Sequence, residues 1–172
     1  FIAELVAGIY SKSLSMTSDA FHAFLHVIVA LVALASVHEF MGFPPEKIKR
    51  WSAGINIALF FLLAFLIRNE ALSRLNNPPV VSIGSVFFVV AILGLIANVY
   101  TVKILHGYSD NKNRFLLRIH MIFDAIGSII VIIGGIEIVR TGLYVWDPRL
   151  SLVLAAVIVI GALRMSWELM SK

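Results

Sequence analysis

The chain has 172 residues, of which 60% are hydrophobic and 14% are charged, and its formal net charge is +4. A soluble domain averages about 45–50% apolar residues, so this composition indicates a membrane protein. The chain has no cysteine, which excludes disulfides and thiolate metal sites. The positive charge is typical of basic cytoplasmic loops, and with no aromatic-interleaved basic stretch it does not indicate nucleic-acid binding.

Six apolar runs follow one another along the chain. The first lacks the basic start and cleavage site of a signal peptide, so we interpret it as the second half of a truncated first helix. Each of the other five is near the roughly 17–25 residues that a membrane span requires. The runs are Phe1–Tyr10, Leu14–Val37, Trp51–Ile67 with a polar continuation to Leu75, Val80–Leu105, Phe115–Val139 and Leu150–Trp167. The sequence therefore predicts an all-α membrane protein, a six-transmembrane-helix bundle forming one domain over residues 1–172.

The basic residues predict the orientation of the bundle. If the chain starts in the cytoplasm, the cytoplasmic side carries nine of them: Lys47, Lys49, Arg50, Lys103, Lys112, Arg114, Arg118, Arg164 and Lys172. The opposite side carries five: Lys12, Arg68, Arg74, Arg140 and Arg149. Because cytoplasmic loops carry an excess of Lys and Arg, both termini are expected in the cytoplasm.

Two apolar runs each carry a pair of metal-ligating residues four positions apart. His22 and His26 lie in the second run, and His120 and Asp124 lie in the fifth. On a helix this spacing places both side chains of a pair on one face. At about 1.5 Å per residue, the first pair lies roughly 12–18 Å from the outer edge and the second roughly 8–14 Å from the inner edge. In a hydrocarbon core about 30 Å thick the two pairs therefore lie at nearly the same depth.

Four ligands of these types would suit a tetrahedral zinc ion. Ionisable groups inside a membrane are costly and indicate function, although such residues also stabilise helix packing through hydrogen bonds. Because histidine titrates near neutral pH and metal binding releases protons, such a site could exchange metal for protons.

Other polar residues lie in the apolar runs. Asp19 is on the same face as His22 and is expected either to accept a hydrogen bond from a ligand or to line the site's mouth, although direct ligation is an alternative. Asn56 and Asn98 would either line the cavity or form hydrogen bonds between helices. Ser128, one turn beyond Asp124, and Gly127 are interpreted as packing residues, with Ser128 also a candidate for the metal pathway.

Five short motifs in order resemble the cation diffusion facilitators, a family of proton-coupled exporters of zinc and similar metals. They are Ser13–His22, Glu70-Ala71 with Asn77-Pro78-Pro79, Gly94–Asn98, His120–Ser128, and Asp147-Pro148 with Ser151. The resemblance implies His22, His26, His120 and Asp124 as metal ligands, six helices, a homodimer and a cytoplasmic C-terminal domain. The chain departs from the family twice: it ends soon after the sixth helix, without that domain, and His26 stands where the family usually has Asp.

These observations predict a divalent-metal exporter exchanging metal for protons, without enzymatic activity or a prosthetic group. Zinc is the expected cargo, with Fe²⁺, Co²⁺ and Ni²⁺ as alternatives. A different reading is a non-transporting membrane protein of this fold that senses metal or pH as a partner subunit. A His-ligated di-iron oxygenase would need more than the five histidines present.

Overall fold

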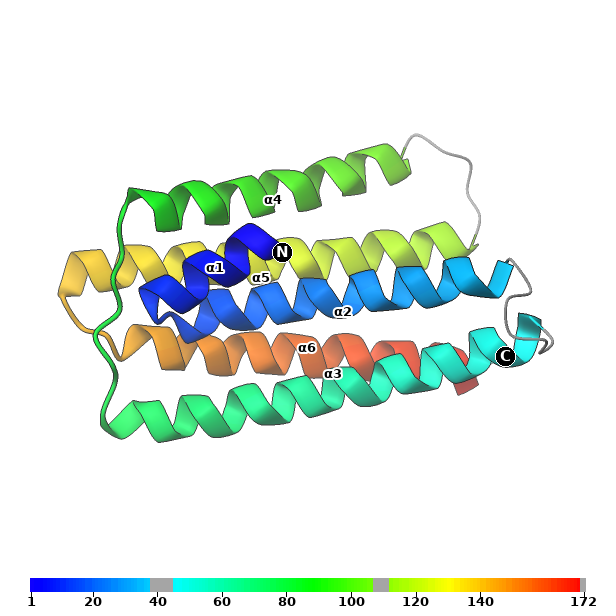
Figure 1. Ribbon diagram of the computed structural model, residues 1–172, viewed down its shortest axis with the longest axis horizontal. Coiled ribbons are helices and arrows are strands. Elements are labelled where there is room, and N and C mark those ends of the chain that lie inside the picture. Colours follow the sequence, from blue (N-terminus) through cyan, green and yellow to red (C-terminus); the bar gives the residue numbers. More distant parts are fainter. Residues whose placement is uncertain (38–44, 107–111, 171–172) are drawn as a thin grey trace.

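A computed structural model of the chain describes residues 1–37, 45–106 and 112–170. Within these ranges it describes the backbone but not the side chains of residues 29–30, 32–37, 45–50, 52, 105–106, 112–121 and 168–170. The described ranges are helical and contain no strand. The helices run side by side along the long axis of the molecule (Figure 1). They are α1 (Ile2–Ser11), α2 (Leu14–Val37), α3 (Pro45–Asn76), α4 (Ser85–His106), α5 (Lys112–Thr141) and α6 (Trp146–Met170).

The structure confirms the predicted bounds of α2 and corrects three others. The third helix begins at Pro45 instead of Trp51, since Pro45 is compatible with a first helical position. Its polar continuation after Ile67 was predicted to Leu75 and ends one residue later, at Asn76. The fourth begins at Ser85 instead of Val80, since the backbone N–H of Ser82 donates to the carbonyl of Ser11 at 2.9 Å. The sixth begins at Trp146, so Asp147 and Pro148 lie in its first turn instead of in a separate turn.

Helix α2 lies in the middle of the bundle and contacts α1, α3, α5 and α6. On one side of it, α3 and α6 pack together around a core that includes Phe60, Leu154 and Ile158. On the other side, α1, α4 and α5 contribute Ala7, Phe87 and Val131 to a second core around Met16. The face of α2 between these two cores is therefore shielded on several sides.

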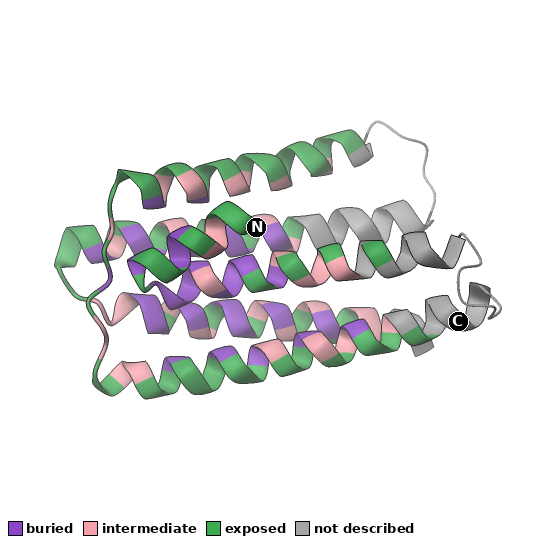
Figure 2. Ribbon diagram, in the orientation of Figure 1, coloured by how far each residue is buried: buried purple, intermediate pink, exposed green. Residues whose placement is uncertain are grey.

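The outer surfaces of the helices are strongly apolar. Figure 2 shows that exposed residues cover most of α4, whereas buried residues line the facing sides of α2, α5 and α6. Within the described residues, four stretches are long and apolar enough to cross a membrane: Ala53–Asn76, Ser85–Ile104, Ile122–Thr141 and Trp146–Trp167. Helix α1 is a shorter apolar helix. An apolar exterior around a partly polar interior is the arrangement expected in a lipid bilayer.

One buried carboxylate joins the start of α2 to the start of α6. Asp147 is 1% exposed and accepts hydrogen bonds from the hydroxyl groups of Ser13 and Ser15 at 2.7 and 2.8 Å. It also accepts from the backbone N–H groups of Leu14 at 2.7 Å and Ser15 at 3.1 Å. The first N–H groups of a helix have no partner within that helix, so Asp147 caps α2 from a distant part of the chain.

Candidate metal site

The site is built on the central helix α2. His22 and His26 are one helical turn apart, and their imidazole rings meet edge to face with centroids 4.7 Å apart. Their Nε2 atoms are 3.1 Å from each other. The predicted pairing of these two side chains on one helix face is therefore present in the structure.

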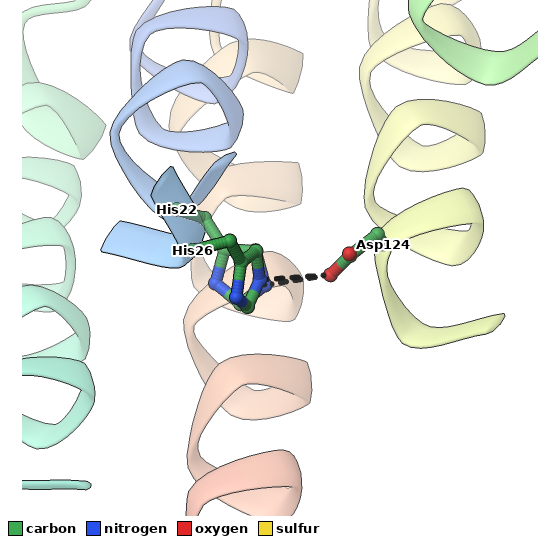
Figure 3. A group of neighbouring side chains, drawn as sticks. All are labelled: His22, His26 and Asp124. Atoms are coloured by element: carbon green, nitrogen blue, oxygen red, sulfur yellow. Dashed lines mark hydrogen bonds and ion pairs between the residues drawn. The ribbon is translucent and has the colours of Figure 1, made fainter. Parts of the chain in front are cut away.

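Helix α5 brings Asp124 to the same point. Its Oδ1 atom lies 2.9 Å from Nε2 of His22 and 3.3 Å from Nε2 of His26. Figure 3 shows the two imidazole rings turned from α2 toward the carboxylate of α5. His22 and Asp124 are 102 positions apart in the sequence, yet together with His26 they direct one nitrogen or oxygen atom each at a common centre.

The separations of these three atoms fit a tetrahedral metal ion. Zinc binds imidazole nitrogen and carboxylate oxygen at about 2.0–2.1 Å, which places neighbouring ligand atoms of a tetrahedron about 3.3 Å apart. The three observed separations are 2.9, 3.1 and 3.3 Å. Small side-chain movements would therefore let one ion contact all three atoms.

The site is largely withdrawn from solvent. His22 and Asp124 are buried, and His26 is partly buried. The ring of Phe60 on α3 packs against both imidazoles, with centroids 5.0 Å from His22 and 5.3 Å from His26. This contact could not be predicted from the sequence, because an aromatic residue in an apolar helix is not distinguishable from an ordinary core residue.

His120, the fourth predicted ligand, lies in α5 one turn before Asp124. Its side chain is outside the described residues, so its participation stays a prediction. Among the described residues, the metal-competent cluster consists of His22, His26 and Asp124, whose ligand atoms all lie within 4.8 Å of one another. Asp19 does not belong to that cluster.

Asp19 instead belongs to a neighbouring hydrogen-bonded network. Its Oδ2 atom accepts from the hydroxyl of Ser128 at 3.2 Å, and that hydroxyl accepts from the side-chain amide of Asn98 at 3.1 Å. The Ser128 hydroxyl also lies 3.4 Å from the backbone carbonyl of Asp124. Asn98, which was expected either to line the cavity or to form a hydrogen bond between helices, thus forms the interhelical hydrogen bond. Ser128 links α2, α4 and α5.

Gly127 makes room for this network. A Cβ atom at this position would lie 2.7 Å from Oδ1 of Asp19, closer than real Cβ contacts allow. The close packing expected at Gly127 is therefore present, and its buried neighbour is a carboxylate. Asp19, His22, Phe60 and Gly127 also line one cavity with apolar residues of α6.

Comparison with known proteins decides the family. A model of the cation efflux transmembrane domain matches residues 1–172. The chain belongs to the cation efflux family. Membership confirms the resemblance to the cation diffusion facilitators, and with the apolar helices it makes this chain a multi-pass integral membrane protein.

Curated relatives of this cation efflux chain carry metal-transport names. It is 30% identical to the zinc transporter ZitB of Escherichia coli over 179 residues, covering 98% of the chain and 55% of that protein. It is 33% identical to the metal cation efflux system protein CzcD of Cupriavidus metallidurans over 180 residues, covering 99% and 55%. It is 30% identical to the cadmium, cobalt and zinc/H(+)-K(+) antiporter of Bacillus subtilis over 169 residues, covering 91% and 53%. The chain spans about half the length of these relatives.

Proposed function

We propose that this chain exports divalent transition-metal ions, zinc first among them, in exchange for protons. The observation that carries the proposal is the convergence of His22, His26 and Asp124 on one point between α2 and α5. Imidazole and carboxylate are suitable ligands for zinc, and three of them leave a further position for His120. The transport names of the relatives support the same activity.

Proton exchange follows from the chemistry of the three atoms. The Asp124 carboxylate can only accept hydrogen bonds when ionised, so an Nε2–H group of His22 or His26 would be its donor when no metal is bound. A metal ion would occupy the same lone pairs and displace the proton. Protons arriving from the other side of the membrane would in turn release the metal. The Bacillus subtilis relative is named as an antiporter of metal against H⁺ and K⁺, which supports this coupling.

The transport cycle requires six helices to cross the membrane with both termini in the cytoplasm, as proposed from the basic residues. The end of the bundle where α2 ends and α3 begins, called here the α2–α3 end, is then the cytoplasmic end. A cysteine at position 111 would be labelled by an impermeant reagent only from the cytoplasm, and Arg149→Cys only from the opposite side. The reverse pattern would overturn the proposed direction of transport. A homodimer in the bilayer is part of the proposal, on the resemblance alone.

Zinc flux into proteoliposomes tests the function. Wild-type protein should carry zinc into the liposomes as protons leave them down their gradient, and Asp124→Ala should carry none while remaining folded. Glu70→Gln, a change in an exposed carboxylate of α3, is the control and should transport like the wild type. Wild-type flux from Asp124→Ala would contradict the proposal. Replacing zinc by iron(II), cobalt or nickel would rank the alternative cargoes.

A further inference from the structure

Asn56 is a buried polar residue to which the site described above gives no role. It lies in α3 and is 3% exposed. Its Oδ1 atom is buried and accepts no hydrogen bond from any residue that the structure describes. A buried carbonyl oxygen without a donor destabilises a protein, so a native structure that keeps one needs an explanation. Asn98, the other amide considered from sequence, donates to Ser128 and needs none.

The position of Asn56 follows from its neighbour on the same helix face. Phe60 is one turn farther along α3, and its ring contacts both His22 and His26. Helices α2 and α3 run in opposite directions (Figure 1). Moving from Phe60 to Asn56 is therefore a shift of about 6 Å toward the α2–α3 end. The step from His22 to His26 goes the same way, so Asn56 lies on the side of the metal site that faces this end.

Helix α6 presents small residues near the level of Asn56. Its residues Leu154, Ile158 and Ala162 pack in the same cluster as Phe60. Because α6 is antiparallel to α3, the level of Asn56 corresponds to the far end of this cluster, near Ala162. Gly161 and Ala162 also line the cavity that contains His22, and a Cβ built on Gly161 would lie within 4 Å of no described residue outside its own stretch of helix. The α6 side of the cavity is therefore lined by small residues at this level, one helical turn beyond Ile158.

We propose that the Asn56 carbonyl oxygen is a transient ligand for the metal ion on its way between the α2–α3 end and the His22–His26–Asp124 cluster. This inference rests on the proposed function and adds a step to it. A metal ion entering a membrane interior loses water ligands, and an amide oxygen can replace one of them. Because the amide is neutral, it holds the ion less strongly than the carboxylate and imidazoles beyond it. The oxygen therefore lowers the barrier to loading without changing the final affinity.

Zinc-binding kinetics on the purified full chain in nanodiscs test this step. Asn56→Leu removes the oxygen at similar size, and it should slow zinc association about tenfold, a barrier change of about 1.4 kcal/mol. Dissociation should slow equally, so that the equilibrium Kd stays unchanged. The thermal midpoint should stay the same or rise, because an unpaired buried polar group is lost. Asn56→Asp keeps an oxygen and should restore the association rate.

Asn98→Leu is the matched control, because it removes an amide that already has a partner. It should lower the thermal midpoint without slowing zinc association. The inference would be overturned if Asn56→Leu associated with zinc as fast as the wild type, or if both variants were slowed equally. It would also be overturned if Asn56→Leu lost both zinc affinity and thermal stability. Asp124→Ala separates the two levels of the proposal. If Asp124→Ala binds zinc like the wild type, the proposed function fails. If Asp124→Ala loses zinc binding but Asn56→Leu still binds zinc at the wild-type rate, only the inference fails.

Discussion

Two buried aspartates anchor α2, one at its start and one near its middle, and they are surrounded differently. Asp147 accepts four hydrogen bonds, all from hydroxyl or backbone N–H groups of Ser13, Leu14 and Ser15. Such donors cannot leave, and the backbone N–H groups do not titrate. Asp124 faces two imidazole nitrogens, each of which can hold a proton or release it. The Asp147 carboxylate therefore has all its hydrogen bonds from fixed groups of the protein, whereas the Asp124 carboxylate depends on protons, or a metal ion, that can be exchanged.

The difference separates a structural cluster from a binding cluster without reference to any ligand. Complete pairing with fixed donors makes a buried polar group rigid and position-defining. In the binding cluster, by contrast, each partner is itself a potential metal ligand. When its protons leave, the lone pairs of these nitrogen and oxygen atoms become available to a metal ion.

Removing the carboxylate of the binding cluster should abolish function and spare the fold. Asp124→Ala should weaken zinc binding by at least about 100-fold, more than the 10–100-fold typical for residues that only support a ligand. Its thermal midpoint should stay close to that of the wild type, since the two imidazoles can pair with each other or with water. Isothermal titration with zinc and a thermal melt in the same detergent measure both. A large loss of stability with retained zinc affinity would reverse the roles assigned to the two aspartates.

The opposite pattern is expected for the structural cluster. Asp147→Ala should destabilise the protein by about 3 kcal/mol, because losing a helix cap costs about 0.5–2 kcal/mol and leaving a buried donor unpaired costs about 1–3 kcal/mol. Denaturant or thermal unfolding in detergent measures the change. Zinc affinity of the folded fraction should change much less than in Asp124→Ala. A variant as stable as the wild type would mean that water replaces the carboxylate at this position.

Crowding the network beside the binding cluster should have an intermediate effect. In Gly127→Ala the new methyl group would collide with the Asp19 carboxylate, which must then move. We expect zinc affinity to fall about tenfold, within the range for residues that support ligands. Gly54→Ala is the control, because its added Cβ would lie within 4 Å of no described residue outside its own stretch of helix. Equal affinities in both variants would show that Asp19 acts independently of the metal.

The smallest expected effect concerns the histidine that departs from the family pattern. His26→Asp removes one titrating nitrogen, so zinc binding should depend less steeply on pH between about 5.5 and 7. In the wild type, affinity should fall as pH falls, because protons compete with zinc for the imidazole nitrogens. The added carboxylate should also favour harder ions such as manganese. Isotherms for zinc and manganese at two pH values measure both effects; an unchanged pH slope and metal ratio would exclude His26 as a ligand.

Local spacing made much of the site predictable. The pairing of His22 and His26 depends only on helix periodicity, and the approach of Asp124 depends on the depth of two helices in a bilayer. Helix bounds were less predictable where distant contacts decide them. Residues 80–84 are apolar enough for a helix, yet Ser82 donates to Ser11 in the turn between α1 and α2. The role of Asp147 was hidden for the same reason, since its partners are more than 130 residues away.

The unpaired oxygen of Asn56 also lay beyond sequence reasoning. Sequence places a polar residue in an apolar helix, but it cannot say whether a partner is within reach. Only the packing of α3 against α2 and α6 shows that Asn98 has a donor–acceptor partner and that Asn56 Oδ1 has none among the described residues.

The cap on α2 has a consequence for how the protein is made. Leu14 and Asp147 are 133 residues apart, so the start of α2 is synthesised long before its capping carboxylate. Until α6 emerges from the ribosome, the N–H groups at that helix start must be satisfied by water or lipid headgroups. The cap on α2 therefore forms only after α6 has been synthesised, so α2 acquires its final hydrogen bonds late in the assembly of the bundle.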